Sequence, residues 1–240
     1  MTLRKLATIV AVLAGFAAGS ACASEAAIQQ SFQKRFPSAT VESVARTPFA
    51  GIYEVVFNGQ IAYTDEKLSF VFFGNLVDVR SGTDRNLTRE RNAQLTAVAL
   101  KNSTDSAIKR VRGNGKRLIY TFEDPNCPYC RELQKELMKL TDITIYTFLL
   151  PILSADSAEK SRAVWCAKDR AKAWDDLMSR GAAPQTGAKC DAPFEKTREL
   201  AQRFGIRGTP AVYLADGRQV GGGYVPAAEL EQALNSVASK

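Results

Sequence analysis

The sequence predicts an exported protein with an α+β N-terminal domain, a helical linker, and an α/β domain that contains a helical insertion. Three observations predict this organisation. A short apolar leader comes first, short strand-like segments separated by turn residues follow it, and a strand–helix–strand succession begins after residue 116. A chain of 240 residues is long enough for one large or two small domains.

Residues 1–23 are predicted to be a cleavable signal peptide. Two basic residues precede the apolar stretch 6–16, and an Ala-Cys-Ala triplet then fits the cleavage pattern, which makes Ser24 the first mature residue. The stretch is shorter than the roughly 20 residues that span a membrane. Lipoprotein processing at Cys22 is the alternative, although the leucine usual three positions upstream is missing. Export implies an oxidising compartment in which disulfides persist.

Charge and cysteine content narrow the function classes. The formal net charge of +7 comes from interspersed acidic and basic residues without a long basic block, which argues against a nucleic-acid partner. The chain has five cysteines and no histidine. Cleavage would leave an even number, which suits two disulfides. Because the mature cysteines include only one close pair, a structural zinc site is disfavoured.

Residues 24–85 are predicted to form the α+β domain. An amphipathic helix over 25–36 stops at Pro37, and Asn58-Gly59 and Gly74-Asn75 are predicted hairpin turns. The strand-like segments are 41–45, 52–57, 60–63, 68–73 and 76–79. Such a small sheet buries little core and leaves open edges, so pairing with a second copy and a self-sufficient accessory domain both remain possible. Residues 86–115 have only a thin apolar stripe, which predicts a largely solvated linker helix.

Residues 116–240 are predicted to form the α/β domain. The strands 118–122 and 143–150 flank a helix and should run parallel. The segments that follow are a helical stretch at 155–180, a helix at 194–204, a hairpin of 211–214 with 219–224 around a type I′ turn at Asp216-Gly217, and a last helix from Pro226. This order is the thioredoxin arrangement.

Cys127-Pro128-Tyr129-Cys130 lies between the first strand and its helix. If Cys127 is the N-cap and Pro128 the first helical residue, the amides of Tyr129 and Cys130 point at the Cys127 sulfur. These amides and the helix dipole would stabilise a thiolate there. Cys130, about one turn deeper, could close a disulfide or resolve a mixed one. The alternatives are that the two cysteines supply two of the four ligands of a zinc site, or that they form an inert structural disulfide. Redox chemistry is favoured over both.

Two further features could support such a site. A cis bond between Thr209 and Pro210 would turn the chain beside the cysteines and leave the Thr209 backbone free to pair with an extended substrate; a trans proline that opens an edge strand is the alternative. Neither Cys166 nor Cys190 lies at an obvious helix N-terminus, which favours a structural over a catalytic role. A disulfide between them would contribute about 3 kcal/mol.

The motifs F-E-D-P-N-C-P-Y-C-R, A-V-W-C-A-K-D and G-T-P-A-V-Y-L-A-D-G, in this order, resemble the periplasmic protein-disulfide isomerases of the DsbC type, in the DsbC/DsbG family with a thioredoxin fold. The resemblance implies a homodimer joined through the N-terminal domains, misfolded disulfide-containing exported proteins as substrates, and a membrane reductant of the DsbD type. It further implies that Cys127 attacks, Cys130 resolves, Pro210 is cis and Cys166–Cys190 is a structural disulfide. No metal and no organic cofactor are implied.

The sequence departs from that family at two places. DsbC-type isomerases usually have glycine where this chain has Pro128, so a DsbG-like sulfenic-acid reductase and a disulfide oxidase stay open beside the isomerase. A chaperone without redox turnover is the alternative from another class. The buried acid that thioredoxins place six residues before the first cysteine falls on Thr121. Glu123 or Asp124 could relay the Cys130 proton instead, although solvated loop carboxylates are the favoured interpretation.

Overall fold

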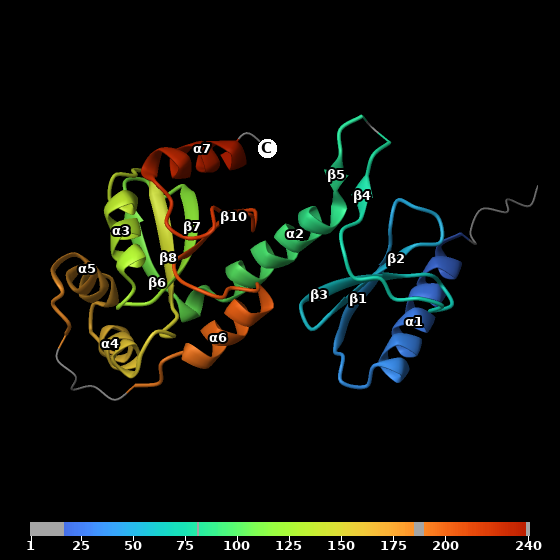
Figure 1. Ribbon diagram of the computed structural model, residues 1–240, viewed down its shortest axis with the longest axis horizontal. Helices are drawn as coiled ribbons and strands as arrows, with labels where there is room; N and C mark the ends of the chain where they lie inside the picture. The colour runs from blue at the N-terminus through green and yellow to red at the C-terminus, as the bar shows by residue number, and fades with distance from the viewer. Residues whose placement is uncertain (1–16, 81, 185–189, 239–240) are drawn as a thin grey trace, which may run out of the picture. The chain divides into compact units, whose positions relative to one another are not determined.

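A computed structural model describes residues 17–80, 82–184 and 190–238. The chain divides into two compact units, one ending at Gly74 and one beginning at Asn75 (Figure 1). β4 (Val77–Asp78) pairs with β5 (Arg85–Asn86) and does not join the N-terminal sheet. No helix in the described ranges is long and apolar enough to cross a membrane.

The N-terminal unit is a helix packed on a three-stranded antiparallel sheet. The helix α1 (Ala17–Arg35) begins before the predicted residue 25, and the sheet has the order β1 (Val41–Arg46), β2 (Tyr53–Phe57), β3 (Gln60–Thr64). Ile28 and Phe32 of the helix are buried against sheet residues that include Val55. Asn58 and Gly59 have φ values of 47° and 74°, as the predicted turn requires.

Two predictions for this part of the chain are wrong. Residues 68–73 form no strand and contribute only an isolated bridge between Tyr63 and Phe72, and the predicted strand at 76–79 shrinks to β4. The segments on either side of Gly74-Asn75 do not pair, so that dipeptide is not a hairpin turn. The physical reason is burial, since the side chains of Phe70, Phe72 and Phe73 stay exposed even though Phe72 and Phe73 contact the rings of Tyr63 and Phe57.

The linker prediction is half right. The helix α2 (Leu87–Asn102) begins where expected, and the Asn86 side chain caps it by accepting the Arg89 amide at 2.8 Å. After the short 3-10 turn η1 (Thr104–Ser106), however, the strand β6 (Ile108–Arg112) replaces the predicted helix and forms an edge of the C-terminal sheet. An arginine at the inward-facing position 110 hides the alternation that normally marks a strand.

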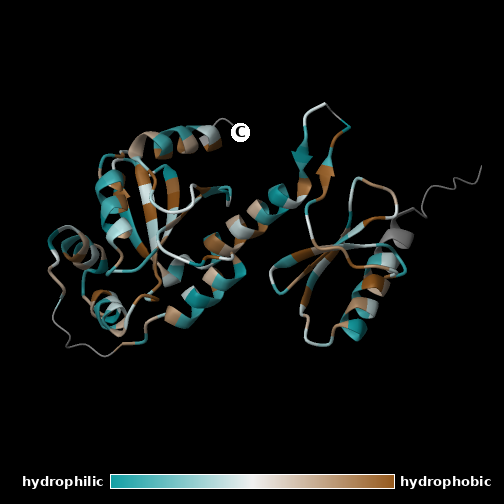
Figure 2. Cartoon of the chain, in the orientation of Figure 1, coloured by the Kyte–Doolittle hydropathy of each residue, from teal (hydrophilic) through white to brown (hydrophobic). Residues whose placement is uncertain are grey.

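The C-terminal unit has the predicted thioredoxin order. Its five-stranded sheet runs β10-β9-β7-β8-β6, in which β7 (Arg117–Glu123) and β8 (Ile143–Leu149) are parallel and the other pairs antiparallel. One face packs against α3 (Pro128–Leu137) and α7 (Ala227–Ala238), and α6 (Phe194–Arg203) packs on the other. Figure 2 shows hydrophobic residues along the central strands β7 and β8.

Two local predictions in this unit need correction. The helical stretch 155–180 is two helices, α4 (Ala155–Trp165) and α5 (Arg170–Arg180), because the Asp169 side chain caps a new helix by accepting the Lys172 amide. The strands β9 (Ala211–Leu214) and β10 (Gln219–Val220) are joined by the four residues 215–218. Only Gly217 has positive φ, at 80°, so the turn is not type I′.

Candidate active site

Cys127 and Cys130 lie at the start of α3, directly after β7. Cys127 is the N-cap and Pro128 the first helical residue, as predicted, and the Cys127 sulfur accepts the Cys130 amide at 3.4 Å. The Cys127 thiol also donates to the Thr209 carbonyl at 3.2 Å. Both thiols are free and almost fully buried, whereas the Tyr129 side chain between them is 65% exposed. The two thiols are therefore covered, while the side chain between them is open to solvent.

The loop before β9 supplies the other wall of this site. The Thr209–Pro210 peptide bond is cis, and the Thr209 carbonyl faces the Cys127 sulfur. The Thr209 hydroxyl is buried and has no partner among the described residues. A cavity of about 290 Å³ lies beside this loop and is lined by residues 205–211 together with Gln219 and Gly222. The loop thus combines a backbone acceptor at the sulfur with open space next to it.

Glu123, the last residue of β7, is fully buried and not a solvated loop carboxylate, so the favoured interpretation of this residue is wrong. Gln134 of α3 donates to both carboxylate oxygens at 2.8 and 2.7 Å, and the Thr121 hydroxyl donates at 2.6 Å. Burial raises the pKa of the Glu123 carboxyl, while the charge of Arg110 and the hydrogen bonds oppose this rise. Glu123 is therefore a buried group that can hold a proton.

Asp124 is also fully buried, so the solvated interpretation is wrong here too. Its carboxylate accepts the amides of Asn126 at 2.8 Å, Ile152 at 2.8 Å and Leu153 at 3.0 Å, and the Ser157 hydroxyl at 2.8 Å. These donors come from the segment before Cys127 and from the segment after β8. Asp124 therefore fixes two segments that flank the cysteine pair.

The surroundings of Cys130 favour the protonated form of its thiol. Burial raises the pKa of its thiol, and the negative charge of Glu123 raises it further, while a hydrogen bond from the Asp124 amide opposes the rise. A thiol that must ionise during turnover in this setting needs a nearby group to take its proton. Glu123 is the buried carboxyl whose charge acts on it.

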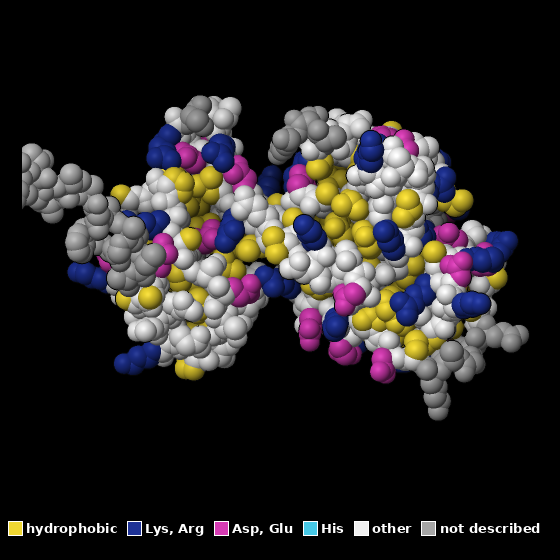
Figure 3. Space-filling view, turned by 180° about the vertical axis from the view of Figure 1, so that it is seen from behind, with side chains coloured by type: hydrophobic (Ala, Val, Ile, Leu, Met, Phe, Trp, Pro, Cys, Tyr) yellow, Lys and Arg dark blue, Asp and Glu magenta, His cyan; other side chains and the backbone are white. Residues whose placement is uncertain are grey.

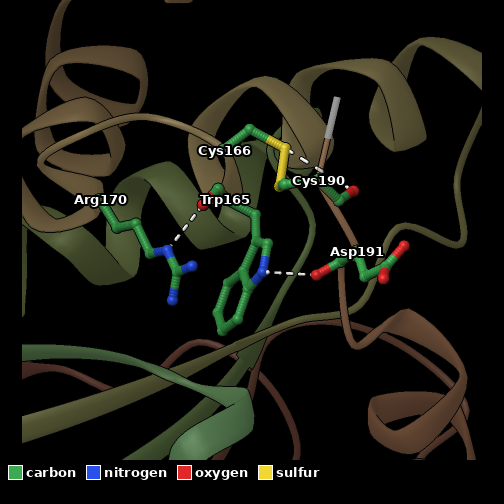
Figure 4. The surroundings of a disulfide bond; sticks show 5 residues. All are labelled: Trp165, Cys166, Arg170, Cys190 and Asp191. Carbon is green, nitrogen blue, oxygen red and sulfur yellow. Dashed lines mark hydrogen bonds between the residues drawn. A yellow bond between two sulfur atoms is a disulfide. The ribbon is translucent and has the colours of Figure 1, made fainter. Parts of the chain in front are cut away.

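Cys166 and Cys190 form the disulfide expected from the resemblance, between the end of α4 and the segment before α6 (Figure 4). The adjacent Trp165 donates its indole N–H to the Asp191 carbonyl at 3.1 Å, and its own carbonyl accepts Arg170 Nε at 2.6 Å. Trp165 and Cys190 belong to the same hydrophobic cluster as the two site cysteines. The disulfide thus braces the helical insertion against the site.

Sequence reasoning missed Arg110 and Gln134. Arg110 lies on the strand mistaken for linker, and it reaches the Glu123 region through Gln134 and the Thr147 hydroxyl. Gln134 follows Cys130 by four residues, which was the available indication that the two share a helix face. Within the described ranges, no group of three histidine, cysteine, aspartate or glutamate side chains is arranged to hold a metal ion.

A thioredoxin-type sheet that presents a helix-capping cysteine, a deeper second cysteine and a cis-proline loop defines a thiol–disulfide oxidoreductase. Comparison with known proteins agrees with this class. Residues 104–238 match the model of a thioredoxin-like domain, and residues 19–89 match the N-terminal domain of disulfide bond isomerase proteins.

Individual relatives give the family. A DsbC-type thiol:disulfide interchange protein of Bordetella parapertussis is 44% identical over 87% of this chain and 73% of its own length, and DsbC of Escherichia coli K12 is 30% identical over 96% and 94%. A disulfide interchange protein structure from Neisseria gonorrhoeae is 45% identical, with a TM-score of 0.53 over 56% of this chain and 96% of its own. The chain belongs to the DsbC family and is a disulfide isomerase of the thiol–disulfide oxidoreductase class.

Proposed function

We propose that this isomerase rearranges non-native disulfides of exported proteins through a mixed disulfide on Cys127. The observation that carries the proposal is the position of the Cys127 sulfur, which accepts a helix N-terminal amide and contacts the Thr209 carbonyl. The helix N-terminal amide donates to this sulfur, and a cysteine sulfur in its thiolate form is the nucleophile in disulfide exchange. Pro128 pre-forms the helix start, and the exposed Tyr129 lies on the approach to the sulfur.

The first step is common to isomerisation and reduction. The Cys127 thiolate attacks one sulfur of a substrate disulfide, a new sulfur–sulfur bond forms, and the other substrate sulfur leaves as a thiolate. In isomerisation, a substrate thiolate then attacks the substrate sulfur of the mixed disulfide and releases Cys127 as a thiolate. The substrate has exchanged partners, and no electrons have been gained or lost.

In reduction, Cys130 completes the reaction instead. Its thiol gives its proton to the Glu123 carboxylate, and the resulting thiolate attacks the Cys127 sulfur and expels the substrate sulfur. The substrate gains two electrons and the cysteine pair becomes a disulfide. Returning the pair to the dithiol needs a thiol reductant, for which we infer a membrane protein of the DsbD type.

The loop at Thr209 and Pro210 is inferred to hold the substrate segment beside the sulfur. The backbone of Thr209 faces Cys127, and an extended polypeptide can pair with such a backbone as a short added strand. The adjacent cavity offers space for a side chain of that polypeptide. Cys166–Cys190 is assigned a structural role, because it packs behind the cysteine pair and not at a helix N-terminus.

The N-terminal domain, residues 24–85, is inferred to join two copies of the chain. It matches the N-terminal domain of disulfide isomerases, and several of its large apolar side chains are exposed in the single chain: Phe70, Phe72, Phe73, Val77 and Val79. Hydrophobic side chains are visible on the surface of each unit in Figure 3. A homodimer would cover such a surface. The residues from 86 to the start of β6 would then be the linker, and those up to 240 the catalytic domain.

The compartment is inferred to be the periplasm, reached through a signal peptide at residues 1–23. Most of that leader, residues 1–16, lies outside the described residues. The basic and apolar pattern of the leader, its cleavage site and membership in the DsbC family support this location.

Refolding of a scrambled multi-disulfide protein tests the proposal. The wild-type chain in its reduced form should restore the activity of the scrambled protein without added oxidant, and Cys127→Ser should not. A disulfide oxidase would form disulfides without rearranging them, and a sulfenic-acid reductase would act on oxidised single thiols instead. A chaperone would keep its effect in Cys127→Ser, and that outcome would refute the proposed mechanism.

A further inference from the structure

Arg110 is a buried charged residue to which the mechanism above gives no task. Only 9% of its side chain is exposed, although it lies on the edge strand β6. Its Nη1 donates to the Gln134 side-chain oxygen and to Asp175 Oδ1 at 2.8 Å, and its Nη2 donates to the Thr147 hydroxyl at 2.9 Å. Its Nε is buried and has no partner among the described residues.

The two neutral side chains that bind Arg110 also bind Glu123. Gln134 accepts from Arg110 through its oxygen and donates through its nitrogen to both Glu123 oxygens. The Thr147 hydroxyl lies 3.4 Å from Glu123 Oε1. Gln134 is one helical turn beyond Cys130 on α3. A positive and a negative charge are thus joined through shared partners directly behind the second cysteine.

Stability does not account for this arrangement. Removing a guanidinium from water is costly, and the buried Nε without a partner among the described residues adds to this cost. Buried ion pairs are often no better for stability than apolar side chains of similar size. The charge of Arg110 does have a definite effect on Glu123, however. Burial favours the neutral carboxyl, and Arg110 favours the carboxylate.

The protonation state of Glu123 determines whether the Cys130 thiol can pass its proton to this carboxyl group. A carboxylate can accept the Cys130 proton, whereas a neutral carboxyl cannot. Among the described residues, the charged or titratable groups of this cluster are Glu123 on β7, Cys130 on α3 with Cys127 beside it at the helix N-cap, Arg110 on β6 and, beyond Arg110, the half-exposed Asp175 on α5. Arg110 is the cation in this set, so it opposes the effect of burial on Glu123.

We propose that Arg110 is a positioning residue that, through the partners it shares with Glu123, favours the carboxylate form of Glu123 and so sets how often Cys130, and not the substrate, resolves the mixed disulfide. The proposal rests on the mechanism above and adds a determinant of its outcome. With Arg110 in place, reduction competes with isomerisation. Without it, nothing of like charge opposes the effect of burial on Glu123, so Cys130 finds an acceptor less often and the mixed disulfide remains available to substrate thiols.

The two steps can be separated with the reduced full-length protein and a small aromatic disulfide, dithiobis-nitrobenzoate, whose thiolate product is coloured. Cys127 attacks it and releases one coloured thiolate, leaving a mixed disulfide with the second half. Cys130 then passes its proton to Glu123 and attacks Cys127, which releases the second thiolate. The protein loses two electrons and the reagent gains them. Rapid-mixing absorbance therefore gives one phase for each cysteine.

The pH profile of the second phase tests the role of Arg110. In the wild type the second phase should slow as Glu123 becomes protonated at low pH. Arg110→Met should move this acid limb up by about one pH unit, which slows the second phase about tenfold on the limb. Arg110→Lys keeps the charge and should leave the limb near that of the wild type. Glu123→Gln should slow the second phase about 100-fold or more and abolish the limb.

Asp175→Asn is the matched control, since it removes the charge of another partner of Arg110 but no group that stabilises the Glu123 carboxylate, and it should not move the limb upward. If Arg110→Met does not fold, Arg110→Gln replaces it, because glutamine keeps hydrogen-bonding groups but removes the charge that acts on Glu123, so the limb should still move up.

An Arg110→Met second phase that overlays the wild-type profile, while Glu123→Gln loses the limb, would overturn the role of Arg110 and leave the proposed function intact. If neither Arg110→Met nor Glu123→Gln changes the pH profile of the second phase, both the role of Arg110 and the role of Glu123 as proton acceptor are overturned. The first phase tests the proposed function separately. It should disappear in Cys127→Ser and stay unchanged in Arg110→Met.

Discussion

Replacing Asp124 by alanine should destabilise the C-terminal unit strongly, because this buried carboxylate holds two segments together. It accepts three backbone amides and one hydroxyl within 3.0 Å. Alanine would leave the amides of Asn126, Ile152 and Leu153 without their acceptor. The segment after β8 would lose its attachment to the segment that leads into Cys127.

The size of the loss follows from the number and type of these bonds. Hydrogen bonds to a charged group contribute about 1.5–3 kcal/mol each, and water entering the gap would compensate some of the donors. We therefore expect Asp124→Ala to lower the free energy of unfolding by about 3–5 kcal/mol. Asp124→Asn keeps the size and one acceptor oxygen, but its amide group would face donors. It should lose about half as much.

Urea unfolding followed by tryptophan fluorescence is the appropriate assay. The chain has two tryptophans, Trp165 and Trp174, and both lie in the C-terminal unit, so the signal reports that unit alone. The free energies of unfolding are compared between variants whose m-values, the slopes against urea concentration, are equal. Asp156→Ala is a matched control, since Asp156 binds Asn126 but is 56% exposed, and it should cost less than about 1 kcal/mol. An Asp124→Ala loss no larger than that control would refute the anchoring role.

Three further outcomes are expected. Because folding raises the pKa of Glu123, the folded chain binds this proton more tightly than the unfolded chain, so stability should fall as pH rises above about 4.3; urea unfolding of Glu123→Gln should lack this fall, and parallel profiles would contradict the shift. Replacing Cys166 and Cys190 together by alanine should cost about 3 kcal/mol, measured by the same unfolding assay against wild type without reductant. Cys130→Ala should accumulate mixed disulfides with substrate on non-reducing gels, and its absence there would count against Cys130 as the resolving residue.

The local geometry of the cysteine pair could be predicted because its causes lie within a few residues. Pro128 directly after Cys127 and the apolar spacing of the following helix define the N-cap without reference to the rest of the chain. The parallel pairing of β7 and β8 follows from the helix between them. These features needed no knowledge of distant contacts.

The burial of Glu123 could not be predicted in this way, because its surroundings come from elsewhere in the chain. Arg110 precedes it by 13 positions on a strand that was mistaken for linker, and Gln134 follows from the next helix. The prediction of a strand around Phe72 was wrong for the opposite reason. This segment has the composition of a strand, but among the described residues its strand-type backbone pairing is limited to one bridge with Tyr63.

The two adjacent acidic residues at the end of β7 illustrate how backbone geometry separates structural and chemical roles. Successive residues of an extended strand point to opposite sides, so Glu123 faces the side of Gln134 and Cys130, while Asp124 faces the segment after β8. Asp124 accepts hydrogen bonds from backbone amides and a hydroxyl. These neutral donors hold its carboxylate in place. Glu123 instead shares its partners with the cation Arg110, so its charge depends on a group that one substitution can remove. An anchor must keep its hydrogen bonds throughout turnover, whereas a proton acceptor must change its charge, and only Glu123 has surroundings that allow this change.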